Sequence, residues 1–171
     1  EAVIVPKDSV ERKVLALAID PANSKHLYAG ISVNSSNALY FSDDGGLNWR
    51  LDKKLNDNIK NIFIDPSSPR QNRTVIVTGN LSIANKKNNS WIINKVPVAM
   101  GRISELSGGY DKKRKEFILY AISKIQEGKG PAIDVLNSTM DGGANWHNIQ
   151  VGLNKFSQEL AAAPDLRALA S

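Results

Sequence analysis

The chain has 171 residues, 42% of them hydrophobic and 23% charged, and its 22 Lys and Arg against 17 Asp and Glu give a net charge of +5. It holds no cysteine and only two histidines, which excludes disulfides and cysteine-based or multi-histidine metal sites, and we expect no metal or other cofactor. No apolar run approaches the ~20 residues of a membrane-spanning helix. The densest basic run, 111–116, contains no aromatic residue, so neither a membrane span nor a nucleic-acid partner is predicted.

After a short apolar segment at 2–6, the stretch VLALAIDPANSKHLYAG at 14–30 joins two apolar runs through an Asp-Pro turn. The same design recurs at 59–79 and 103–123 and begins again at 159–171. The runs are rich in Ile, Val, Leu and Tyr and are bounded by Gly, Pro, Asn and Asp, as is typical of short strands. The turn aspartates recur about every 45–54 residues and are Asp20, Asp65, Asp111 and Asp165.

A second strand–turn–strand unit follows each of these hairpins. ALYFSDDGGLNWRLDKK at 38–54 is matched by DVLNSTMDGGANWHNIQ at 134–150, whereas 81–95 lies between them and has lost the Asp-Gly-Gly. The three tryptophans therefore occupy equivalent positions, and we expect all of them to be mostly buried: Trp49, Trp91 and Trp146. Four short strands in each unit at this period predict an all-β fold of propeller blades.

The residues of the two complete turns each have a structural role. Asp-Gly between apolar strands predicts a tight hairpin, because glycine adopts positive φ at little cost. The Asp side chain and the preceding hydroxyl can accept hydrogen bonds from loop amides, and the Trp packs against the strands. We interpret these ten residues as structural: Ser42, Asp44, Gly45, Gly46, Trp49, Thr139, Asp141, Gly142, Gly143 and Trp146.

The S/T-x-D-G-G-x-x-W turns at 42–49 and 139–146 resemble Asp-box repeats, also called BNR repeats. Such repeats occur in sialidases, xyloglucanase-type glycosidases, sortilin-type receptors and photosystem assembly-factor propellers. The phrase AIDP…LYAG at 18–30 is most similar to the xyloglucanase and sortilin branch. The resemblance implies a β-propeller whose boxes lie on blade hairpins, away from the functional face. This fold hosts unrelated functions, so the resemblance by itself does not imply an activity.

The repeat predicts one partial propeller domain over 1–171 with about 3.5 blades of four antiparallel strands. The expected blades are 14–55, 56–98, 99–152 and the start of a fourth at 153–171. Closed propellers have 4–8 blades, so we expect a fragment of a larger propeller, the alternative being an open arc that pairs with another copy. Segment 156–171 is also rich in Ala and Leu, which leaves strand and helix both open there.

One functional hypothesis is part of a glycoside hydrolase of xyloglucanase or sialidase type. It requires two carboxylates flanking a sugar on loops that enter the channel, and the acidic residues there are Asp57, Glu127 and Asp134. A sialidase-type Arg-Ile-Pro motif is incomplete, because GRIS at 101–104 lacks the proline. A xyloglucanase-type site needs aromatic residues for sugar stacking, and only Phe156 lies in these loops.

The favoured hypothesis is a non-catalytic Asp-box module, extracellular or periplasmic, that binds or scaffolds a protein or glycan. Segment 122–134 lengthens the repeat by about ten residues, and an insertion of this kind often marks the binding face of a repeat protein. We predict a mobile loop there, with four binding residues: Lys124, Gln126, Glu127 and Lys129.

Overall fold

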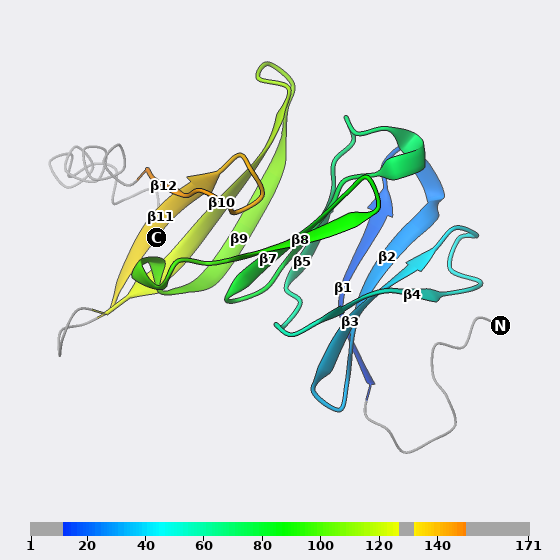
Figure 1. Ribbon diagram of the computed structural model, residues 1–171, viewed down its shortest axis with the longest axis horizontal. Coiled ribbons are helices and arrows are strands. Elements are labelled where there is room, and N and C mark those ends of the chain that lie inside the picture. The colour runs from blue at the N-terminus through cyan, green and yellow to red at the C-terminus, as the bar shows by residue number, and fades with distance from the viewer. Residues whose placement is uncertain (1–11, 127–131, 150–171) are drawn as a thin grey trace, which may run out of the picture.

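The computed structural model describes residues 12–126 and 132–149, which form three four-stranded antiparallel sheets in chain order (Figure 1). The first sheet contains β1 (Arg12–Asp20), β2 (Asn23–Val33), β3 (Ser36–Ser42) and β4 (Arg50–Leu55). The second contains β5 (Asn61–Ile64), β6 (Val75–Thr78), β7 (Ser82–Lys87) and β8 (Ser90–Lys95). The third contains β9 (Arg102–Asp111), β10 (Glu116–Ile125), β11 (Ile133–Thr139) and β12 (His147–Asn148). Two short 3₁₀ helices, η1 (Arg70–Asn72) and η2 (Val98–Met100), lie in the connections.

Each sheet is a meander in which every strand pairs with its neighbour in the chain. The prediction of an all-β fold built from propeller-type blades of four antiparallel strands is therefore confirmed. The expected strand at 2–6 and the expected half-blade at 153–171 lie outside the described residues.

The second sheet lies between the other two (Figure 1), and its strands β5, β6 and β7 contribute side chains to a core on each of its faces. On β5, Ile62 and Ile64 pack into the core shared with the first sheet, whereas Phe63 between them packs into the core shared with the third. The side chains of β6 are distributed between the two cores in the same way, because successive side chains of a strand point to opposite faces of the sheet. A strand covered on both sides has apolar residues on both of its faces, which explains the consecutive Val75, Ile76 and Val77 of β6.

The first-to-second-strand turns use the aspartates of the repeat. The carboxylate of Asp20 accepts a hydrogen bond from the Ala22 amide at 2.9 Å, and that of Asp65 accepts one from the Ser67 amide at 2.9 Å. Asp111 does the same for the Lys113 amide, at 2.8 Å. These are Asx turns, in which the side chain satisfies the backbone where the chain reverses.

The second sheet has a different turn in place of the Asp box. Asn88 and Asn89 form a two-residue loop between β7 and β8 with φ values of 50° and 60°. Two successive left-handed residues are the geometry of a type I′ hairpin turn, and asparagine tolerates it better than most residues. Trp91 then pairs with Lys86 across the hairpin.

The prediction of a loop over 122–134 was wrong at both ends of the segment, where 122–125 and 133–134 belong to paired strands, and 127–131 lie outside the described residues. Strand β10 continues to Ile125 and β11 begins at Ile133, so that these two residues face each other. Lys124 pairs with Asp134 in the same register. The ladder between β10 and β11 has seven paired positions, as many as the ladder between β2 and β3, so the added residues lie in the connection between the two strands. Of the predicted binding residues, Glu127 and Lys129 lie outside the described residues.

Candidate functional site

The first Asp-box turn, between β3 and β4, is closed by its own side chains. The Ser42 hydroxyl donates to Asp44 Oδ1 at 2.8 Å and accepts a hydrogen bond from the Gly46 amide at 2.9 Å. The Asp44 carboxylate accepts from both the backbone and the side-chain amide of Asn48, at 2.9 and 2.7 Å. The carboxylate thus holds the loop in shape.

The second turn, between β11 and β12, repeats these bonds. Thr139 Oγ1 donates to Asp141 Oδ1 at 2.8 Å and accepts from the Gly143 amide at 3.0 Å. Asn145 donates to Asp141 through its backbone and side-chain amides, at 2.9 and 2.7 Å. This asparagine was missed as a member of the motif, although the letter before the tryptophan is identical in both copies.

Hydrogen bonding lowers the pKa of both box carboxylates. The Asn48 backbone and side-chain amides and the Ser42 hydroxyl hold the pKa of Asp44 at about 2. For Asp141, burial acts to raise the pKa, but the hydrogen bonds from Asn145 and Thr139 outweigh it and the pKa falls below its usual value. Both carboxylates accept hydrogen bonds that favour the ionised form. A general acid must instead carry a proton to donate, so neither carboxylate suits that role.

The three tryptophans are half-buried, less than we expected. Trp91 packs against the core between the first and second sheets, and Trp146 against the core between the second and third. Trp49 donates its indole N–H to the Gly46 carbonyl at 2.9 Å, whereas the buried Trp146 N–H has no partner. Each tryptophan lies shortly after a hairpin turn, where its surroundings cover it only in part.

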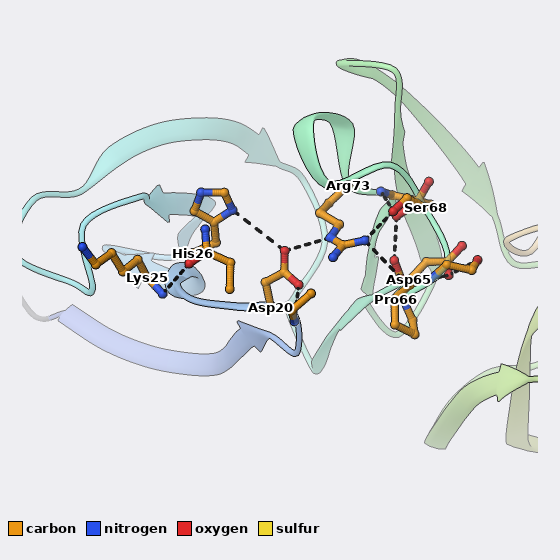
Figure 2. A network of polar contacts seen from close by, with 11 residues as sticks. Asp20, Lys25, His26, Asp65, Pro66, Ser68 and Arg73 are labelled. Atoms are coloured by element: carbon orange, nitrogen blue, oxygen red, sulfur yellow. Dashed lines mark hydrogen bonds and ion pairs between the residues drawn. The ribbon is translucent and has the colours of Figure 1, made fainter.

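A buried ion pair joins the first and second sheets (Figure 2). Arg73 precedes β6 and donates through Nε to Asp20 Oδ2 at 2.8 Å; the two side chains are 5% and 1% exposed. The same guanidinium donates to the Pro66 carbonyl at 3.2 Å and to the Ser68 carbonyl, and so fixes the loop between β5 and β6. His26 Nδ1 lies 3.8 Å from the same Asp20 oxygen.

The pKa of Asp20 is lowered by its partners despite its burial. Burial acts to raise the pKa, and the hydrogen bonds from Arg73 and from the Ala22 amide, together with the positive charge of Arg73, lower it further than burial raises it. Asp20 therefore remains ionised where the two sheets meet, and its charge is used structurally.

A second polar contact joins each of the first two sheets to the sheet that follows it. It is made by the last strand of the sheet, β4 or β8, through the residue three positions after the tryptophan. In the first sheet this is Asp52, whose two carboxylate oxygens each lie 2.8 Å from Lys86 Nζ. In the second it is Asn94, whose side-chain amide donates to the Gly142 carbonyl at 3.0 Å, beside Asn85, which donates to the same oxygen at 2.7 Å. Equivalent positions thus use an ion pair at one junction and carboxamides at the other.

The two candidate catalytic carboxylates that the structure describes, Asp57 and Asp134, lie in different surroundings. Asp57 Oδ2 accepts hydrogen bonds from the Leu81 amide at 2.8 Å and from the Ser82 hydroxyl at 3.0 Å, so this residue anchors the turn between β6 and β7. Asp134 is exposed at the start of β11, opposite Lys124. Glu127 lies outside the described residues.

The two binding candidates that the structure describes, Lys124 and Gln126, are both exposed at the end of β10. Across 12–126 and 132–149 no group of three or more His, Asp or Glu side chains could hold a metal ion. Over the same residues no helix is long and apolar enough to cross a membrane.

Three meandering sheets with two Asp-box turns are the architecture of Asp-box β-propeller blades. No protein-family model and no curated protein matches the chain. Among solved structures, the chain is similar to the crystal structure of an ancestral GH74 enzyme, with a TM-score of 0.49 and 14% sequence identity. The similarity covers 81% of this chain and 25% of that chain, so the chain spans about a quarter of its length.

Proposed function

We propose that this chain is a non-catalytic Asp-box propeller module that binds a protein or glycan, with further blades completing the propeller. The observation that carries the proposal is the set of hydrogen bonds that the Asp57 carboxylate accepts. Asp57 is the one candidate acid that lies in a connection between two sheets. Its carboxylate accepts two backbone amides and a hydroxyl, from Asn58, Leu81 and Ser82. A carboxylate saturated by donors that hold a turn is poorly placed to protonate a glycosidic oxygen.

The long hairpin of β10 and β11 is the proposed binding element of this module. Its connecting segment has seven residues, 126–132, against two at the corresponding turn of the first sheet, Asn34 and Ser35, and the exposed Lys124 and Gln126 lie where β10 ends. Added residues in a surface connection cost little stability, and such connections commonly carry binding residues. Secretion to an extracellular or periplasmic location agrees with glycan binding and is part of the proposal.

The test compares binding with hydrolysis. The protein is screened on a glycan array and, in parallel, incubated with polysaccharides while released reducing ends are measured. We expect binding without release of reducing ends, and weaker binding after Lys124→Ala. Release of reducing ends that is abolished by Asp57→Asn or Asp134→Asn would overturn the proposal in favour of a glycoside hydrolase.

A further inference from the structure

A groove of about 520 Å³ lies between the second and third sheets, at the end of the blades that carries the second Asp box. Its walls come from the loop before β6, from β7 and β8, and from the turn after β11. This end is opposite to the β10–β11 hairpin tip, since the turns alternate between the two ends of a meander. We propose that this groove binds a neutral oligosaccharide, an inference that rests on the proposed binding function and gives it a second location.

Carboxamides dominate the polar lining. Four asparagines face the groove, namely Asn72, Asn85, Asn88 and Asn94. The Nδ2 groups of Asn85 and Asn94 both donate to the Gly142 carbonyl, which fixes the two side chains and leaves their Oδ1 atoms as acceptors. Preorganised uncharged acceptors suit sugar hydroxyls, because binding then immobilises few protein side chains.

Apolar side chains supply the remaining surface. Phe117 and Ile76 lie at the inner part of the groove, and Ile92 and Met140 are 59% and 44% exposed beside it. A sugar presents C–H groups on one face and hydroxyls at its edge, so it needs an apolar surface flanked by a few placed polar groups. The volume falls within the ~300–1,000 Å³ that ligand sites usually occupy.

The charges of the lining favour an uncharged ligand. Asp65 Oδ1 accepts from the Ser67 amide and hydroxyl at 2.9 and 2.6 Å, and Asp141 is held by Asn145 and Thr139, so both carboxylates are engaged in their own turns. Lys87 is the one cationic side chain among the lining residues that the structure describes. An acidic sugar usually requires several cations or a bidentate arginine, and this lining provides neither.

The experiment records two-dimensional ¹H–¹⁵N spectra of the protein during titration with maltotriose, cellotriose, xylotriose and mannotriose, with 3′-sialyllactose as an acidic probe. We expect saturable shifts with at least one neutral trisaccharide, centred on the side-chain amides of the four groove asparagines. The acidic probe should bind at least about tenfold more weakly, in line with the loss expected for an unpaired buried charge.

Two matched variants test the location. Ile92→Ser removes an apolar side chain from the groove, whereas Ile93→Ser changes the adjacent exposed residue of β8, which does not line it. Ile92→Ser should weaken binding about fivefold or more, as expected for lost apolar contact, and Ile93→Ser less than twofold. Circular dichroism checks that both variants fold.

The proposal is overturned if no neutral trisaccharide shifts the groove asparagines, or if both variants weaken binding equally. Shifts confined to the β10–β11 hairpin would also overturn it, while leaving the proposed binding function intact. Release of reducing ends during the titration would instead count against the non-catalytic function, whichever residues shift.

Discussion

Arg73 Nε lies 2.8 Å from Asp20 Oδ2, although the two residues are 53 positions apart in the sequence. The pair connects the Asx turn of the first sheet to the loop of the second, and both side chains are nearly inaccessible to solvent. Asp65 and Asp111 occupy the same turn in the other two sheets. The arginine beside Asp111, Arg114, belongs to the same turn, whereas the partner of Asp20 comes from the neighbouring sheet. Adjacent blades are therefore joined by side chains specific to each junction.

Removing Arg73 should destabilise the protein strongly. Arg73→Met leaves the Asp20 carboxylate buried without its partner, and breaking a buried pair in this way costs about 3–5 kcal/mol in the free energy of unfolding. The control is Arg50→Met, because Arg50 pairs with Asp43 at the same 2.8 Å but both side chains are more than half exposed. That change should cost about 1 kcal/mol or less. Urea denaturation measures both, and equal losses would contradict the assigned role of the pair.

The protein should lose stability in acid through its low-pKa aspartates. The folded-state pKa values of Asp44, Asp141 and Asp20 lie below the ordinary 3.8. Their contribution is therefore fully present above about pH 4 and is lost as the pH falls through the folded pKa values, for Asp44 at about 2. Denaturation curves from pH 7 to pH 2 should show this decline. In the Asp44→Asn, Asp141→Asn double variant, the free energy of unfolding should fall less steeply with decreasing pH. The same pH dependence as in the unmodified protein would contradict the prediction.

Equivalent glycines of the two Asp boxes should differ in their tolerance of a side chain. Gly45 and Gly142 have φ values of +79° and +70°, so alanine incurs a similar backbone strain of about 1 kcal/mol at each. A Cβ at Gly45 meets nothing within 4 Å, whereas one at Gly142 would overlap the Asn85 side chain. Gly142→Ala should therefore cost about 1–3 kcal/mol more than Gly45→Ala. Thermal melts of the two variants test this, and equal melting temperatures would count against docking of the second box.

Replacing Asn89 with glycine in the turn between β7 and β8 should stabilise the protein. Asn89 has φ of 60°, and Asn89→Gly relieves the left-handed strain and yields the Asn-Gly sequence favoured in type I′ turns. We expect a gain of up to about 1 kcal/mol in unfolding free energy, whereas Asn89→Val should lower it. Chemical denaturation of both variants gives the signs. A loss with glycine would show that the Asn89 side chain contributes more than its backbone conformation costs.

The strands, turns and Asp boxes could be predicted because their causes are local. Alternating apolar residues define a strand, and Asp-Gly-Gly closes a hairpin with bonds that span at most four residues, such as Asn48 to Asp44. A repeat makes each local signal visible several times. The missed Asn48 and Asn145 belong to the same local class, and comparison of the two boxes letter by letter could have identified them.

Contacts between sheets could not be predicted in this way. The Asp52–Lys86 pair, the Asn94–Gly142 bond and the groove beside it join residues 34 to 57 positions apart or line a space that no single strand defines. The half-burial of the tryptophans depends in the same way on what the neighbouring sheet covers. By itself, the sequence determined the blades, because hydrogen bonding and φ preference act over a few residues. Only the tertiary structure decided how blades join and what lies between them, because packing depends on side chains that meet after the chain has folded.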